Sequence, residues 1–123
     1  MVDTSCLVAL AFGEPGGSRI STRLRRFDRL FASALLEAEL LAAFRREHVE
    51  ADISDFIKDL ALVSPDRPLS KELRRTAEAG YLRGADMWHV ACALFLSPEP
   101  GELTFLTLDK PQRAVARRLG FAV

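Results

Sequence analysis

The sequence predicts an α/β fold in which helices cover both faces of a mainly parallel central sheet. Segments with strand character alternate with segments of helical spacing along the chain. The strand-like segments are short and apolar without strict polar alternation, as in strands buried on both faces. Residues 83–96 read as a helix that is apolar almost all round, a pattern typical of a helix at the centre of a domain.

Length and composition predict one globular domain over residues 1–123. Lys+Arg and Asp+Glu both number 17, so any contact with nucleic acid must come from a local patch of charge. Cys6 and Cys92 lie in apolar runs and are expected to be small core residues, neither a disulfide nor a zinc site. With no signal peptide and no run of ~20 apolar residues, we expect a cytoplasmic protein.

The first half of the chain is predicted to contain two strands and four helices. Residues 1–4 read as the end of a strand, shorter than usual, which would hold Asp3 loosely. The elements expected after it are helix 5–12, a glycine-rich break at 13–17, helix 18–27, strand 29–32, a helix from 33 or 34 to about 47, and helix 52–60.

The second half repeats the alternation. Its expected elements are strand 61–64, helix 70–80, a loop into helix 83–96, strand 103–108, helix 110–120 and a final strand 121–123. Pro111 suits the first turn of its helix, and Gly120 ends it.

Helix 18–27 is the most basic part of the chain. Ile20, Leu24 and Phe27 share one face at helical spacing, and Arg19, Arg23 and Arg26 share a neighbouring face. A solvated helix face accounts for such a pattern as well as a patch for RNA phosphates or an acidic partner does.

Four acids occupy comparable positions relative to the predicted elements. Asp3 and Asp109 each end a strand, Asp86 begins the apolar helix, and Glu39 lies one to two turns into the helix that starts at 33. Ligands of parallel α/β sheets bind at the carboxyl ends of the strands, where these residues can converge. Each acid alone could equally be a helix cap, a turn residue or a surface residue.

Periodicity does not decide between Glu37 and Glu39, which lie about 200° apart around their helix. Carboxylates gathered within a few ångströms repel one another, and a divalent cation removes that conflict. Oxygen-only ligands suit Mg²⁺ or Mn²⁺, and such clusters support hydrolysis of phosphodiesters.

The order and settings of these motifs resemble the PIN domain family, in particular the VapC-like toxins of toxin–antitoxin pairs. The quoted segments are Asp3–Leu10, Ser33–Leu40, Ala85–Ala91, in which Asp86 and His89 fit D-x-x-H-x-A, and Leu106–Asp109, which fits T-x-D. The resemblance covers essentially the whole chain and selects Glu39 over Glu37. It implies a three-layer α/β/α fold with a short, mainly parallel sheet.

The resemblance further implies a Mg²⁺- or Mn²⁺-dependent ribonuclease with catalytic and metal-binding acids at Asp3, Glu39, Asp86 and Asp109. Thr107 would support this site, and His89 is expected to be structural. A homodimer and a cognate antitoxin are implied as partners. The antitoxin would lie in a groove walled by apolar side chains of the first two helices, Leu7, Leu10, Ile20, Leu24 and Phe27.

Two other functions fit parts of the sequence. An aspartyl-phosphate domain also uses an acid at a strand end, but Asp3-Thr4-Ser5 lacks the second acid of a D-x-D motif. A PIN-fold module that binds RNA or protein with weak or no catalysis would need no divalent ion.

Overall fold

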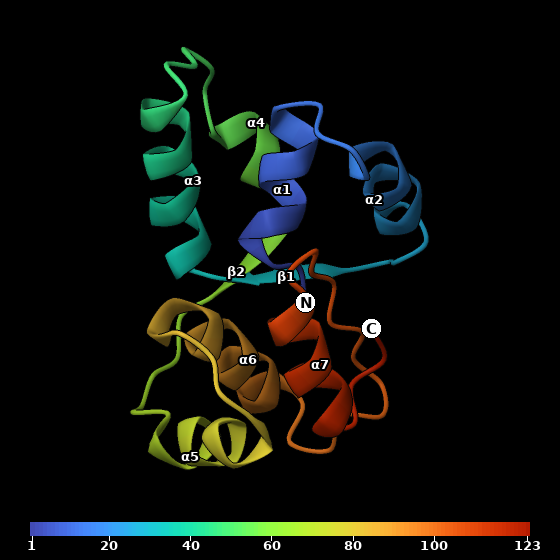
Figure 1. Ribbon diagram of the computed structural model, residues 1–123, viewed down its shortest axis with the longest axis vertical. Coiled ribbons are helices and arrows are strands. Elements are labelled where there is room, and N and C mark those ends of the chain that lie inside the picture. Colours follow the sequence, from blue (N-terminus) through green and yellow to red (C-terminus); the bar gives the residue numbers. More distant parts are fainter.

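The computed structural model describes all residues, 1–123, as helices packed on both faces of a small sheet. The helices are α1 (Thr4–Ala11), α2 (Gly17–Leu24), α3 (Leu35–Arg46), α4 (Ser54–Ile57), α5 (Ser70–Ala79), α6 (Gly84–Leu96) and α7 (Lys110–Arg118). The strands are β1 (Leu30–Ser33) and β2 (Leu60–Val63). Figure 1 shows α1–α4 on one side of the sheet and α5–α7 on the other, which confirms the predicted three-layer α/β/α fold.

The sheet is parallel and shorter in regular structure than predicted. β1 and β2 pair from Leu30 opposite Leu60 to Ser33 opposite Val63. Beyond β1 the sheet continues through single contacts: Val2 N–H donates to the Phe31 carbonyl, and parallel bridges join Val2 to Leu106 and Thr104 to Ala122. Val2 therefore lies inside the sheet, between β1 and the segment that contains Leu106.

Several predicted elements are shorter in the structure: the helix predicted for 18–27 ends at Leu24, and the strand predicted for 121–123 keeps only a bridge at Ala122. The helix predicted for 52–60 is only the single turn α4. Leu60 begins β2 and pairs with Leu30 of β1, although the spacing of the apolar residues also fits a longer helix. The strand predicted for 103–108 keeps only the bridges at Thr104 and Leu106. Beyond them the backbone bonds to side chains, since Leu108 N–H donates to Ser5 Oγ and the Thr107 carbonyl accepts from Arg113.

Alternation along the sheet divides the interior into two apolar clusters. Successive residues of an extended segment point to opposite faces. Met1 and Phe105 accordingly enter the cluster against α5–α7, whereas Val2 and Leu106 enter the cluster against α1–α3. α6 is buried as predicted, with Val90 to Leu94 at most 1% exposed.

Close packing also depends on Gly17, because a Cβ there would lie 2.7 Å from the Ala9 carbonyl oxygen. α2 can therefore approach α1 only with glycine at this position. Cys6 and Cys92 are free and buried, and burial raises the pKa of their thiols to about 12 and about 11 respectively. None of the helices is both long and apolar enough to cross a membrane.

Candidate active site

The fold brings the four acids to the edge of the sheet where four helices begin. Asp3 is the N-cap of α1 and Asp109 is the N-cap of α7. Asp86 lies in the first turn of α6. Glu39, in the second turn of α3, joins them through a hydrogen bond to His89 of α6, whereas Glu37 is exposed. We call these four residues the acid centre.

Asp3 is held firmly, contrary to what its short strand suggested. Its side chain is 5% exposed, and its backbone N–H donates to the Leu106 carbonyl. Asp3 Oδ2 accepts from the Ser5 N–H at 3.1 Å, the Ser5 hydroxyl at 2.6 Å and the Thr107 hydroxyl at 3.1 Å. Thr107 thus contacts the acid centre, at the place expected from its position in the chain.

Asp3 Oδ1 is bound by a residue that the sequence did not reveal. Gln112 Nε2 donates to it at 3.1 Å and to the main-chain carbonyl of Asp86 at 3.3 Å. Gln112 is fully buried, and its backbone N–H donates to Asp109 Oδ1 at 2.7 Å. Its only signal in the sequence is its place one turn into the helix that follows Asp109.

Glu39 belongs to a chain of buried polar groups between α1, α3 and α6. Its Oε2 accepts from the Thr4 hydroxyl and, at 2.7 Å, from His89 Nε2. The other ring nitrogen of His89 bonds to the Ser33 hydroxyl at 2.7 Å. His89 is 1% exposed, so it orients Glu39 and does not reach solvent.

These contacts set the charges of Glu39 and His89. Burial disfavours both charged forms, but hydrogen bonds from His89 and Thr4 outweigh it and lower the pKa of Glu39. For His89, burial is again outweighed, here by the hydrogen bond to Glu39 and the nearby charge of Asp3, so its pKa is raised. The two side chains form an ion pair.

Asp86 has the opposite electrostatic environment. Burial and then the charges of Asp109 and Asp3 raise its pKa, although the exposed Arg83 lies beside it, with Nε 3.5 Å from Oδ2. A carboxylate disfavoured by other carboxylates marks a place where negative charge exceeds its compensation.

The donor atoms fit a divalent cation with oxygen ligands. One oxygen of Glu39, Asp86 and Asp109 makes no hydrogen bond, and Asp3 Oδ1 makes only one. No three acidic, histidine or cysteine side chains are close enough to hold one ion together. Mg²⁺ needs only one or two carboxylates because it keeps several of its waters, so the acid centre fits such an ion.

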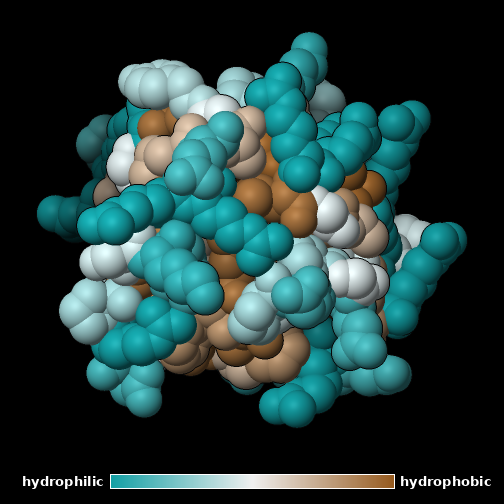
Figure 2. Space-filling view, turned by 90° about the horizontal axis from the view of Figure 1, so that it is seen from below, coloured by the Kyte–Doolittle hydropathy of each residue, from teal (hydrophilic) through white to brown (hydrophobic).

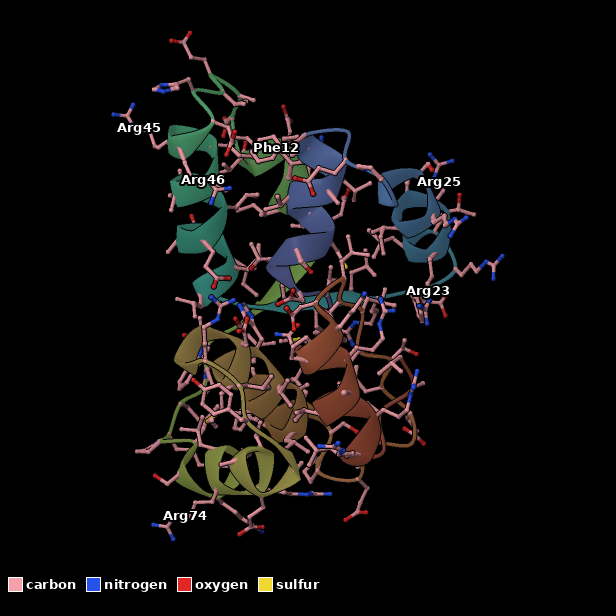
Figure 3. The ribbon with its side chains drawn as sticks, viewed as in Figure 1. Phe12, Arg23, Arg25, Arg45, Arg46 and Arg74 are labelled. Carbon is pink, nitrogen blue, oxygen red and sulfur yellow. The ribbon has the colours of Figure 1, made fainter.

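The predicted arginine face lies apart from the acid centre. Arg19, Arg23 and Arg26, with Ser18 and Thr22, line a polar hollow of about 360 Å³ on the outside of α2. Figure 3 shows Arg23 and Arg25 projecting from that helix. None of the arginines of this segment forms an ion pair.

Comparison with known proteins gives one family. No curated protein and no solved structure matches the sequence. Residues 1–118 match the PIN domain, a family whose members are generally nucleases. The match spans the sheet, all seven helices and every residue of the acid centre. The chain belongs to the PIN domain family.

Proposed function

We propose that this PIN domain is a metal-dependent endoribonuclease, the VapC-like toxin of a toxin–antitoxin pair, and that it hydrolyses RNA at the acid centre. The observation that carries the proposal is that the fold gathers four acids at one edge of the sheet, where burial and the charges of Asp109 and Asp3 raise the pKa of Asp86. Such an excess of carboxylate charge is expected where a site binds Mg²⁺ or Mn²⁺, the ions that PIN nucleases typically use.

The side chains divide into ion-holding and orienting groups. One or two of Asp3, Glu39, Asp86 and Asp109 would contact the ion directly and the others would act through its waters. When bound, the ion would supply activation of water and neutralisation of phosphate charge. The chain itself orients the acids: the Ser5 and Thr107 hydroxyls fix Asp3, and His89 fixes Glu39. Asp3 is thereby a poor nucleophile, because both its oxygens accept hydrogen bonds, and this argues against an aspartyl-phosphate function.

The test is cleavage of a broad RNA panel with Mg²⁺, with Mn²⁺ and with EDTA, comparing the wild type and Asp86→Asn. Glu72→Gln is the matched control, since Glu72 is also a buried acid that begins a helix but lies in α5 with its own cation. Cleavage should need the metal, fall at least about a hundredfold in Asp86→Asn and persist in Glu72→Gln. Equal cleavage by Asp86→Asn would remove the acid centre from the mechanism.

The arginine face of α2 is proposed to bind RNA phosphates. Arg19 and Arg23 are four residues apart on α2, so their like charges repel unless an anion joins them, and Arg26 lines the same hollow from the turn after α2. Replacing Arg23 and Arg26 with Gln should weaken RNA binding for all sequences and reduce the steepness of its salt dependence. An unchanged salt dependence would assign the arginines to a solvated surface.

The proposed antitoxin would occupy an apolar groove of about 660 Å³ between α1, α2 and α4. The apolar residues Leu7, Leu10, Leu24 and Phe27 line it, as expected, while Ile20 is buried beneath them. Leu24→Glu should abolish binding of the antitoxin without changing RNA cleavage, and unchanged binding would place the partner elsewhere. A homodimer is also proposed, to be measured by sedimentation equilibrium.

A further inference from the structure

Gln112 is the only carboxamide side chain in this protein, because the sequence contains no asparagine and no second glutamine. It is fully buried and lies at the point where three segments of the acid centre meet. Its Nε2 donates to Asp3 Oδ1 and to the Asp86 carbonyl, and its N–H donates to Asp109 Oδ1. One residue therefore contacts three of the four acids.

The local sequence predicts a contact for the Gln112 side chain that the structure does not show. Asp109 is an N-cap and Gln112 is the third residue of α7, the arrangement of a capping box. In that motif the glutamine would bond back to the N–H of Asp109. Here the Thr107 hydroxyl accepts from that N–H at 3.0 Å, and the Gln112 side chain turns to Asp3. The hydrogen bonds to Asp3 and to the Asp86 carbonyl therefore determine where the Gln112 side chain lies.

The other end of the carboxamide is an unpartnered acceptor. Gln112 Oε1 is buried and has no hydrogen-bond partner in the protein. If the oxygen and nitrogen of the Gln112 carboxamide were exchanged, its oxygen would face Asp3 Oδ1 and the Asp86 carbonyl, which are both acceptors. These two contacts therefore fix which way the carboxamide is turned. A buried acceptor left without a donor destabilises the fold, and a ligand that donates a hydrogen bond would remove that penalty.

We propose that Gln112 is a fifth functional residue of the acid centre, a positioning residue that fixes Asp3 against the first turn of α6 and accepts a hydrogen bond at Oε1 from the water shell of the bound cation. This inference rests on the proposed metal-dependent function. The hydrogen bond that Gln112 donates to Asp3 is a contact that none of the other three acids can make, because ionised carboxylates accept but do not donate hydrogen bonds.

The test uses the wild-type chain and Mg²⁺ alone. Because Gln112 is the only carboxamide, its NH₂ group gives the only side-chain amide pair in a ¹H–¹⁵N spectrum of the labelled protein. This pair should shift saturably with Mg²⁺, with the same midpoint as the backbone amides of Asp86 and Asp109, and return with EDTA. If the backbone amides shift and the Gln112 pair does not, the role of Gln112 is wrong while the metal site stands. If no signal responds, the metal-dependent function and this inference both fail.

A pair of variants separates the role from simple packing. Gln112→Met keeps the length of the side chain and removes its hydrogen bonds, and it should weaken Mg²⁺ binding about tenfold by calorimetry. Thr76→Val is the control, since Thr76 is a fully buried residue of α5 whose hydroxyl donates to the Glu72 carbonyl. It should lower stability and leave Mg²⁺ affinity within about twofold. Equal Mg²⁺ affinity in Gln112→Met and wild type, or an equal loss in both variants, would overturn the proposal.

Discussion

The protein buries carboxylates in two places, and the pKa of a carboxylate is lowered in one place and raised in the other. In the α5 region, Glu72 is 7% exposed and Arg67 donates to both its oxygens, at 2.6 Å and 3.1 Å. The same guanidinium lies over the Phe95 ring, 5.1 Å from its centroid. The hydrogen bond from Arg67 lowers the pKa of Glu72 to about 2.

The acid centre has more negative charge than its protein cations balance. Its one buried cation, His89, pairs with Glu39, and the exposed Arg83 is the remaining cation beside Asp86. Burial and neighbouring acids raise the pKa of Asp86, the reverse of what happens at Glu72. A carboxylate that serves the fold is neutralised within the fold, whereas the excess at the acid centre is left for a ligand.

The face formed by α5–α7 meets solvent mainly through hydrophilic side chains. Figure 2 shows it from below, with hydrophilic side chains over most of the surface and narrow strips of apolar residues between them. Arg74 projects from α5 into solvent at the far end of the molecule (Figure 3).

The largest expected contrast is the response of stability to metal. Mn²⁺ at a hundred times its dissociation constant should stabilise the wild type by about 2.7 kcal/mol, because it binds only the folded chain. Asp86→Asn should lose most of this effect, whereas Glu72→Gln should keep it although its own stability falls. Thermal unfolding with Mn²⁺ and with EDTA measures both. The same gain in all three proteins would mean that the ion binds elsewhere.

Acid should break the structural pair at a defined pH. The folded pKa of Glu72, about 2, lies below its ordinary value of 4.5, so its pairing stabilises the protein above pH 4.5 and is lost as the pH falls from 4.5 toward 2. Arg67→Gln should lower the unfolding midpoint by a few degrees at neutral pH, and the difference from wild type should close over that window. A difference that persists at pH 2 would show that Arg67 acts through its packing on Phe95.

The smallest expected effect concerns Asp86 without metal. Its folded pKa lies above its ordinary value of 3.8, so the ionised form opposes folding above the folded pKa and has no such effect below 3.8. In EDTA at pH 7, Asp86→Asn should match the wild type or exceed its unfolding free energy by less than about 1 kcal/mol, since the side chain is partly exposed. Chemical denaturation measures the difference, and a clear loss of stability would contradict the excess of charge.

Sequence patterns predicted the layers and the positions of the acids because both depend on local features. A strand end, a helix start and the apolar run of α6 can each be recognised from residues that are close together in the sequence. The extent of helix 52–60 was predicted wrongly, because the spacing of Ile53, Phe56 and Leu60 fits a helix while Leu60 is committed to β1 by long-range pairing.

The orienting contacts could not be predicted from such patterns. Ser5 and Thr107 bond to one oxygen of Asp3 although about a hundred residues separate them, and Ser33 meets His89 across two layers. Gln112 fits a capping box, so local sequence assigns its side chain to Asp109. Only the packed sheet shows that it bonds to Asp3 instead.

Asp3 and its partners Thr107 and Gln112 also set when the acid centre can form during synthesis. The carboxylate of Asp3 is synthesised about a hundred residues before Thr107 and Gln112, the groups that hold it, and Val2 pairs in the sheet with the equally distant Leu106. A nascent chain from which Thr107 and Gln112 are still missing cannot assemble the acid centre. The proposed ribonuclease activity would therefore begin only when the two distant segments meet.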